Sequence, residues 1–311
     1  MIRQSLLWLS QQDSIFRLVR SNPLAWKFAS RFVAGETIEE GVAVASQLAV
    51  RGITASLDLL GESVSRAEEA IAAKDEYLRM LDRMAAAGGL EVNVSVKLTQ
   101  MGFDIDEALC LQNMREILTR AAALDGFVRL DMESSDYTQR TLDFFATELH
   151  PAFGNRCGVV IQTALRRSEG DIERLITMGA RVRLCKGAYL EPPDVAFPDK
   201  ADVDRNYVQL MERLLLEGNY PGLATHDPTI ITHAREFVSR QAIPADRFEF
   251  QMLYGVRRDL QHQLRDAGHR MRVYVAFGTQ WYPYLMRRLA ERPANIAFML
   301  GNLVKESVSR G

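Results

Sequence analysis

The feature that most constrains the fold of this chain is a regular alternation of short strand-like runs and longer amphipathic stretches. The strand-like runs cover residues 54–59, 92–97, 128–131, 159–162, 181–185, 222–225, 248–251 and 272–275. The helical stretches that follow them cover residues 64–87, 106–123, 138–149, 168–178, 202–217, 228–240, 255–267 and 281–291. Eight such units in about 240 residues match a (β/α)8 barrel in number and length.

An open doubly wound sheet is the alternative arrangement for alternating strands and helices. Its first strand–helix turn would carry a glycine-rich phosphate-binding motif, and neither GxGxxG nor GxxxxGK[ST] occurs in the chain. The pattern before residue 51 is helical without strands. The sequence therefore predicts an α/β fold, with a TIM-like barrel at 51–311 and an N-terminal helical segment at 1–50 packed on it.

Composition excludes several classes of protein. Of the 311 residues 47% are hydrophobic, and 38 Lys and Arg face 40 Asp and Glu, so we expect no nucleic-acid partner. No apolar stretch reaches the ~20 residues of a membrane-spanning helix. Three widely spaced cysteines indicate buried thiols in a reducing cytoplasm. The histidines lack metal-ligand spacing, so we expect no metal site.

Strand parity predicts a polar barrel interior. In 92–97 the valines alternate with Asn93, Ser95 and Lys97, and the surrounding helices require the valines, so Lys97 points inward. The same rule sends inward Ser56, Asp58, Arg129, Asp131, Gln162, Arg183, Gln251, Arg272 and Tyr274. Each residue alone could be a satisfied internal hydrogen bond. Together they predict a site for a polar ligand at the carboxyl ends of the strands, because buried charge without a partner is costly.

Two connections and the last helix stand out. The loop 186–201 is long and contains prolines, and long loops in compact domains are often functional. After the sixth strand, 224–228 leads directly into a helix whose N-terminal N–H groups suit a phosphate. Tyr284, Arg287, Arg288 and Glu291 share one helical face, where two arginines could clamp a carboxylate. A solvated face with an Arg287–Glu291 ion pair is the alternative.

Eight strings carry a resemblance to a known family. They are DLLGE at 58–62, SVKLTQ at 95–100, RLDME at 129–133, VVIQTALRRS at 159–168, VRLCKGAYLEP at 182–192, ATHDP at 224–228, FEFQMLYGV at 248–256 and YLMRRLAERPAN at 284–295. In this order they resemble the proline dehydrogenase family, in particular its monofunctional bacterial members.

This resemblance implies a distorted (β/α)8 barrel whose last helix lies over the mouth. It implies noncovalent FAD and oxidation of L-proline to Δ1-pyrroline-5-carboxylate by hydride transfer to flavin N5. Electrons then pass to a quinone, in the first step of proline catabolism to glutamate, and a pyrroline-5-carboxylate dehydrogenase is the metabolic partner. The expected location is the cytoplasm, with the quinone leaving open a weak peripheral association with the inner face of the membrane.

The resemblance also implies roles for individual residues. The substrate residues by this match are Lys97, Leu253, Tyr274, Tyr284, Arg287 and Arg288, with Glu62 as a gate that pairs with Arg287. The catalytic residues are Asp131, beneath the flavin, and Arg183, beside its reactive edge. The cofactor residues are Met132, Gln162, Arg183, Lys186, Gly187, Ala188, Thr225, His226 and Gln251.

Three other functions fit parts of the pattern. A metal-dependent barrel lyase or hydrolase would need clustered carboxylates and histidines, whereas Asp58, Asp131 and His226 are dispersed along the chain. A noncatalytic barrel could use the polar mouth to hold a metabolite. A flavin-dependent reductase acting on folates is the nearest alternative, but the Arg287–Arg288 pair favours a small carboxylate.

Overall fold

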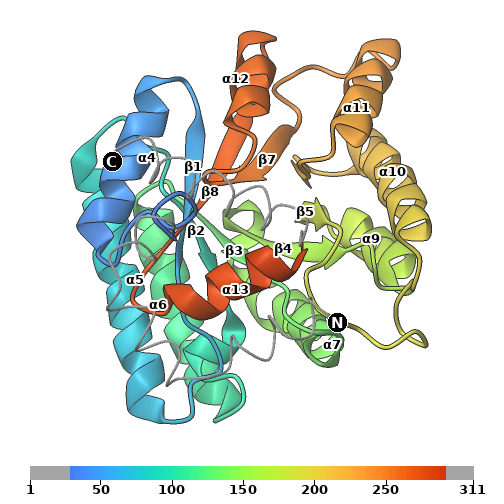
Figure 1. The fold of residues 1–311 in the computed structure, drawn as a ribbon. Helices are drawn as coiled ribbons and strands as arrows, with labels where there is room; N and C mark the ends of the chain where they lie inside the picture. The colour runs from blue at the N-terminus through green and yellow to red at the C-terminus, as the bar shows by residue number, and fades with distance from the viewer. Residues whose placement is uncertain (1–28, 292–311) are drawn as a thin grey trace, which may run out of the picture.

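The computed structural model describes residues 29–291 of the chain, with side chains to residue 286. Eight parallel strands close into one barrel in the order β1 to β8 (Figure 1). The strands are β1 Thr54–Leu59, β2 Asn93–Val96, β3 Phe127–Leu130, β4 Cys157–Gln162, β5 Arg181–Cys185, β6 Gly222–Ala224, β7 Glu249–Leu253 and β8 Met271–Phe277. The predicted barrel is thus confirmed, and the open sheet is excluded.

Helices follow the strands as the sequence predicts. They are α4 Ile38–Val50, α5 Ala67–Ala87, α6 Glu107–Ala123, α7 Ser135–Phe144, α8 His150–Phe153, α9 Ser168–Thr177, α10 Lys200–Glu217, α11 Pro228–Arg240, α12 Arg258–Asp266 and α13 Trp281–Glu291. Short helical turns add η1 Leu98–Met101, η2 Phe145–Leu149 and η3 Gly154–Arg156. The helix predicted over 138–149 is divided, because α7 continues into the wider η2 turn before α8.

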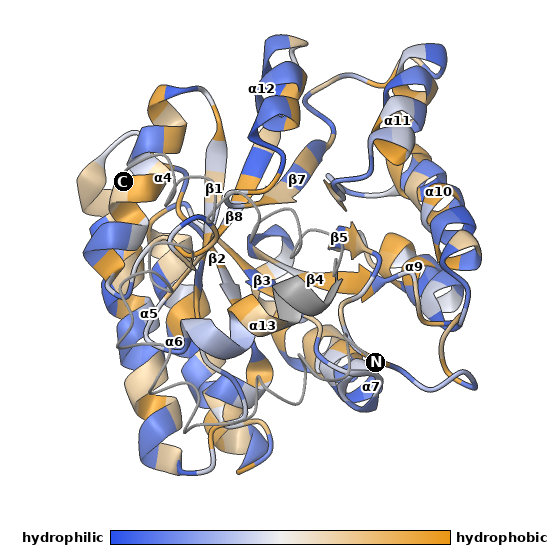
Figure 2. Cartoon of the chain, in the orientation of Figure 1, coloured by the Kyte–Doolittle hydropathy of each residue, from blue (hydrophilic) through white to orange (hydrophobic). Residues whose placement is uncertain are grey.

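The outer layer of the barrel is apolar where strands meet helices. Val94 and Val96 of β2 are fully buried in one large cluster with Tyr77 and Met80 of α5. In Figure 2 the helices around the barrel carry both hydrophilic and hydrophobic stretches, as amphipathic covering helices should. Of the predicted N-terminal segment the structure describes α4, which contacts β1 and β8, while residues 1–28 lie outside the described part.

Helix α13 lies across the barrel and not beside it (Figure 1). Its buried residues Trp281, Tyr284 and Leu285 form a second apolar cluster with Leu60, just after β1, and Ala276, near the end of β8. Both strands end at the barrel mouth. The apolar face of α13 therefore holds it over the carboxyl ends of the strands, as expected from the resemblance.

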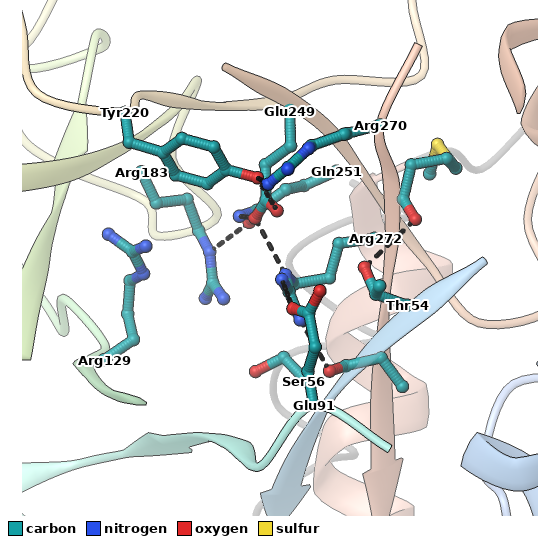
Figure 3. A network of polar contacts seen from close by, with 12 residues as sticks. Thr54, Ser56, Glu91, Arg129, Arg183, Tyr220, Glu249, Gln251, Arg270 and Arg272 are labelled. Carbon is teal, nitrogen blue, oxygen red and sulfur yellow. Dashed lines mark hydrogen bonds and ion pairs between the residues drawn. The ribbon is translucent and has the colours of Figure 1, made fainter. Parts of the chain in front are cut away.

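The opposite end of the barrel interior is also charged. Arg272, the second residue of β8, donates from Nε to Glu249 at 2.8 Å and from Nη2 to Glu91 at 2.6 Å (Figure 3). Arg129 is buried and donates from Nη1 to the carbonyls of Val159 and Arg181. The expectation that Arg129 and Arg272 gather at the mouth is therefore wrong, because parity predicts direction but not depth along the strand.

We predict that Arg272→Met lowers the free energy of unfolding by about 3–5 kcal/mol at neutral pH, because it leaves Glu249 buried without its cation. Burial alone would raise the pKa of Glu249, but attraction by Arg272 outweighs it and lowers that pKa to about 2. The stabilisation is therefore present above the unfolded pKa of ~4.3 and is lost as pH falls toward the folded value. Urea unfolding across this range measures it.

Arg270→Met is the matched control, since Arg270 lies at the same end of β8 but is exposed and bonds Tyr220. Its loss should stay within about 1 kcal/mol. Equal losses in the two variants would contradict a stabilising role for the buried pair.

Candidate active site

The guanidinium of Arg183 is the centre of the polar barrel mouth. Arg183 projects from β5 and is 6% exposed. It donates from Nε to Gln251 at 2.5 Å, from Nη1 to Asp131 at 2.7 Å and from Nη2 to Ser95 at 3.2 Å. Three other strands or strand ends thus hold it in one orientation. Of its five N–H hydrogens, two remain after these contacts with described residues.

Tyr274 of β8 completes the environment of Asp131. Its hydroxyl donates to Asp131 at 2.7 Å, and its ring centroid lies 5.2 Å from the guanidinium carbon of Arg183. Burial raises the pKa of Tyr274 well above its usual value, and the carboxylates of Asp131 and Asp58 raise it further. The phenol therefore stays protonated, and it remains a donor to Asp131 throughout the range in which the protein would work.

Lys97 and Asp58 form a buried ion pair at 3.3 Å on the β1–β2 side of the mouth. Burial and the neighbouring Asp131 raise the pKa of Asp58, although Lys97 opposes them. Burial would lower the pKa of Lys97, but Asp58 and Asp131 outweigh it, so that pKa is raised. Lys97 is therefore a permanent cation here. Within the described part of the chain, Oδ2 of Asp58 has no hydrogen-bond partner.

On the β4–β5 side of the mouth, the side-chain amide of Gln162 lies close to the backbone of Gly187. Gln162 donates to the carbonyl of Glu133 at 2.8 Å, next to the buried Met132. Gly187, at the start of the long loop, has a φ of +106°, and a β-carbon there would lie 2.9 Å from the Gln162 oxygen. Glycine suits this position because of its positive φ and its close approach to Gln162, so the loop backbone packs directly against that side chain just before Ala188.

Four charges gather where β5 and β6 end. Lys186 contacts Asp204 at 2.5 Å and Asp227 at 3.0 Å, and Lys200 also contacts both carboxylates. Asp227 caps α11 by accepting from the N–H of Thr229. The N–H of Thr229, one of those expected to bind a phosphate, is thus already bonded to Asp227. The cluster of two lysines and two aspartates has no net charge.

Thr225 and His226, which follow β6, make hydrogen bonds to residues of β7. The N–H of Thr225 donates to the carbonyl of Gln251 at 3.2 Å. Nε2 of His226 accepts from the N–H of Leu253 at 2.9 Å. Because an acceptor nitrogen carries no hydrogen, this imidazole is the neutral form protonated on Nδ1. His226 therefore holds the end of β7, and with it Leu253, in place.

The structure brings most of the predicted site residues to one end of the barrel. Glu62, in the loop after β1, is close enough for its charge to raise the pKa of Lys97. Tyr284 is buried in the apolar cluster against which Tyr274 packs. Arg287 and Arg288 belong to α13, but their side chains lie outside the described residues.

Sequence reasoning missed two interior residues that bond to site residues: Ser95, which contacts Arg183, and Glu249, which contacts Gln251. Ser95 was predicted to point inward but received no role, and Glu249 was not singled out. Glu249 is 2% exposed and accepts a hydrogen bond from Gln251 at 2.5 Å. Strand parity could have identified Glu249, because it is two residues before Gln251 on β7 and so points to the same side of the strand.

The described residues contain neither a membrane-spanning helix nor a cluster of metal-binding side chains. No helix in that range has the length and apolarity needed to cross a bilayer. In the same range, no three His, Cys, Asp or Glu side chains gather closely enough to bind a metal ion.

A closed parallel barrel with charged and amide side chains at the carboxyl ends of its strands defines a barrel enzyme. Comparison with family models narrows this class, because the model described as "Proline dehydrogenase" matches residues 42–300. The chain belongs to the proline dehydrogenase family, which is flavin-dependent. The activity of this chain is the oxidation of proline to Δ1-pyrroline-5-carboxylate.

Individual relatives agree with the family match. The chain is 41% identical over 306 residues to a proline dehydrogenase of Deinococcus radiodurans, covering 97% of this chain and 98% of that protein. It is 40% identical to proline dehydrogenase 1 of Bacillus subtilis strain 168, with 98% and 100% covered. Proline utilization A of Bdellovibrio bacteriovorus, a solved structure, matches with a TM-score of 0.81 and 27% identity over 89% of this chain and 34% of that one.

We predict that Lys97→Met lowers the free energy of unfolding by about 3–5 kcal/mol at neutral pH, since it leaves Asp58 buried without its cation. The folded pKa of Asp58 is already raised, so the folded state binds this proton more tightly than the unfolded state. Stability from this group therefore falls as pH rises from the unfolded pKa of ~3.9 through the folded value. Without Lys97 the folded pKa of Asp58 should rise further, so the pH range over which stability is lost should extend to higher pH.

Denaturant unfolding at pH 5 and pH 8 measures this effect, and the deficit should be larger at pH 8. Lys200→Met is the control, because that lysine is 75% exposed and its ion pairs are worth about 0–1 kcal/mol. A pH-independent deficit in Lys97→Met would show that Asp58 does not titrate as argued.

Proposed function

We propose that this chain oxidises L-proline with a noncovalently held FAD and passes the electrons to a quinone. The single observation that carries the proposal is the buried, triply held Arg183 at the barrel mouth. A fixed cation there suits a ring system that gains negative charge when it is reduced. The flavin, when bound, supplies the two-electron acceptor; the protein supplies binding, orientation and electrostatics.

The residues present fit such a cofactor. The backbone at Gly187 lies so close to Gln162 that a side chain is excluded, as in a cradle for a flat or phosphate-bearing group. The residues proposed to hold FAD around this cradle are Met132, Gln162, Arg183, Lys186, Gly187, Ala188, Thr225, His226 and Gln251. Lys186 would have to exchange one of its carboxylate partners to contact a phosphate. Asp131, the residue after β3, holds Arg183 in position.

The proposed substrate site lies between the barrel interior and α13. Lys97 keeps its charge in the mouth, and Arg287 and Arg288 follow Tyr284 by three and four residues along α13. Three cations suit the carboxylate of proline. Tyr274, Tyr284 and Leu253 would enclose its apolar ring. Glu62 would pair with Arg287 as a gate.

The proposed partners follow from this chemistry. A quinone would take the electrons, through a weak peripheral contact with the inner face of the membrane from the cytoplasm. The product would pass to a pyrroline-5-carboxylate dehydrogenase. Because Lys and Arg number 38 and Asp and Glu 40, nucleic acid is not proposed as a partner.

The test is the absorption spectrum of the purified protein before and after L-proline is added without oxygen. A flavin band that bleaches with L-proline, and is restored by a soluble quinone, is the expected result. D-Proline serves as the matched control. A colourless protein that binds no added FAD, or a band that L-proline leaves unchanged, would overturn the proposal.

We predict that Arg288→Met, and Arg287→Met to a similar or smaller extent, weaken proline binding by about 1.5–3 kcal/mol each, because each removes a charge-assisted contact. FAD content should not change. Titration of the flavin spectrum with a nonreactive proline analogue measures the affinity. Arg240→Met, at the exposed end of α11, is the control and should bind normally. Unaltered affinity in both α13 variants would remove the arginines from the site.

A further inference from the structure

Glu249 is a buried carboxylate directly beneath the proposed site. It begins β7, and Figure 3 shows it between Arg272 and Gln251. Its Oε1 accepts from Nε2 of Gln251 at 2.5 Å and from Nε of Arg272 at 2.8 Å, and its Oε2 accepts from the hydroxyl of Tyr220 at 3.1 Å. All of these partners donate to Glu249, as an ionised carboxylate requires.

The amide of Gln251 lies between two groups of opposite hydrogen-bonding character. Arg183 can only donate, and its Nε contacts Oε1 of Gln251 at 2.5 Å. Glu249 can only accept while it is ionised. One orientation of the amide satisfies both neighbours, and the flipped amide would place its NH2 against the N–H of Arg183 and its oxygen against the carboxylate. Glu249 therefore determines which end of Gln251 faces Arg183.

We propose that Glu249 is a positioning residue for the oxidation of proline, acting on Arg183 through the amide of Gln251. The inference rests on the function proposed above, in which Arg183 lies beside the flavin. Glu249 contacts Gln251, and Gln251 contacts Arg183, so Glu249 does not touch Arg183 directly. In this scheme it touches neither the substrate nor the cofactor. Its contribution is to fix the direction of the hydrogen bonds, so that Gln251 donates to Glu249 and accepts from Arg183.

The surroundings keep Glu249 in the form that this role needs. Arg272 is 3% exposed and is itself held by the carbonyl of Ala55 at 2.9 Å and by Glu91 at 2.6 Å. Its attraction outweighs the cost of burial and keeps the pKa of Glu249 near 2, so the carboxylate is ionised at neutral pH. Glu91 contacts Arg272 on the side away from Gln251 and gives a matched control.

Glu249→Gln keeps the shape of the side chain but allows it to donate as well as accept. The amide of Gln251 is then free to turn, and Arg183 loses the acceptor at its Nε. Because Arg183 matters most when the flavin gains charge, the loss should fall on the rate and not on binding.

The experiment compares Glu249→Gln and Glu91→Gln holoenzymes with the parent by rapid mixing with L-proline without oxygen. In Glu249→Gln the limiting rate constant for flavin reduction should fall about tenfold, the effect of ~1.4 kcal/mol on the barrier. Proline affinity should stay within about twofold, and Glu91→Gln should match the parent in both. NMR of protein with isotope-labelled arginine gives a second readout: the Nε–H of Arg183, assigned with Arg183→Lys, should shift and exchange faster only in Glu249→Gln.

A double-mutant cycle tests the route of the effect. In a Gln251→Leu background, Glu249→Gln should cause no further loss of rate, because the connecting amide is gone. Additive losses would overturn the proposal, as would an unchanged rate and Nε–H signal in Glu249→Gln. If Glu249→Gln fails to fold, Glu249→Gln/Arg272→Met removes both buried charges together, and the same outcomes apply to it.

These results also separate this inference from the proposed function. Failure of L-proline to bleach the parent protein would overturn the function itself. A parent that is bleached normally, with a Glu249→Gln variant indistinguishable from it, would overturn only the role of Glu249.

Discussion

The buried positive charge of Arg183 is the interaction on which the arrangement of the barrel mouth depends. A cation that is 6% exposed is stable only if a counter-charge and hydrogen-bond acceptors surround it. Asp131 supplies the charge from the end of β3, Gln251 an amide oxygen from β7 and Ser95 a hydroxyl from β2. None of these three strands is a neighbour of β5 in the barrel, so the charge is satisfied only once the barrel has closed.

The barrel interior contains two levels of charge where a structural core would hold branched aliphatic residues. The lower level joins Arg272 to Glu249 and Glu91, and the upper level joins Arg183 to Asp131. Gln251 bonds to both levels and connects them. Such a network is costly to bury, but once every member is bonded it leaves few alternative rotamers. The protein's own side chains therefore fix the orientation of the central cation.

Periodicity in the sequence predicted the barrel, the strand order and the inward direction of each polar residue. The same signals could not predict how far along the barrel axis each side chain lies, because the stagger between strands depends on closure of the whole sheet. Arg129 and Arg272 were thus expected at the mouth and lie lower. Nor could parity pair Arg183 with Asp131, since that contact needs the rotamers of two side chains 52 positions apart. The roles taken from the family resemblance stay predictions until variants test them.

Tyr274 links the polar mouth to the helix that covers it. Its hydroxyl donates to Asp131, the carboxylate that holds Arg183, while its ring packs against the apolar cluster of α13 that contains Trp281 and Tyr284. A shift of α13 would therefore change the packing of this ring, and through its hydroxyl the surroundings of Asp131. The packing of α13 over the mouth and the hydrogen bonding of the carboxylate that holds Arg183 therefore meet at one side chain.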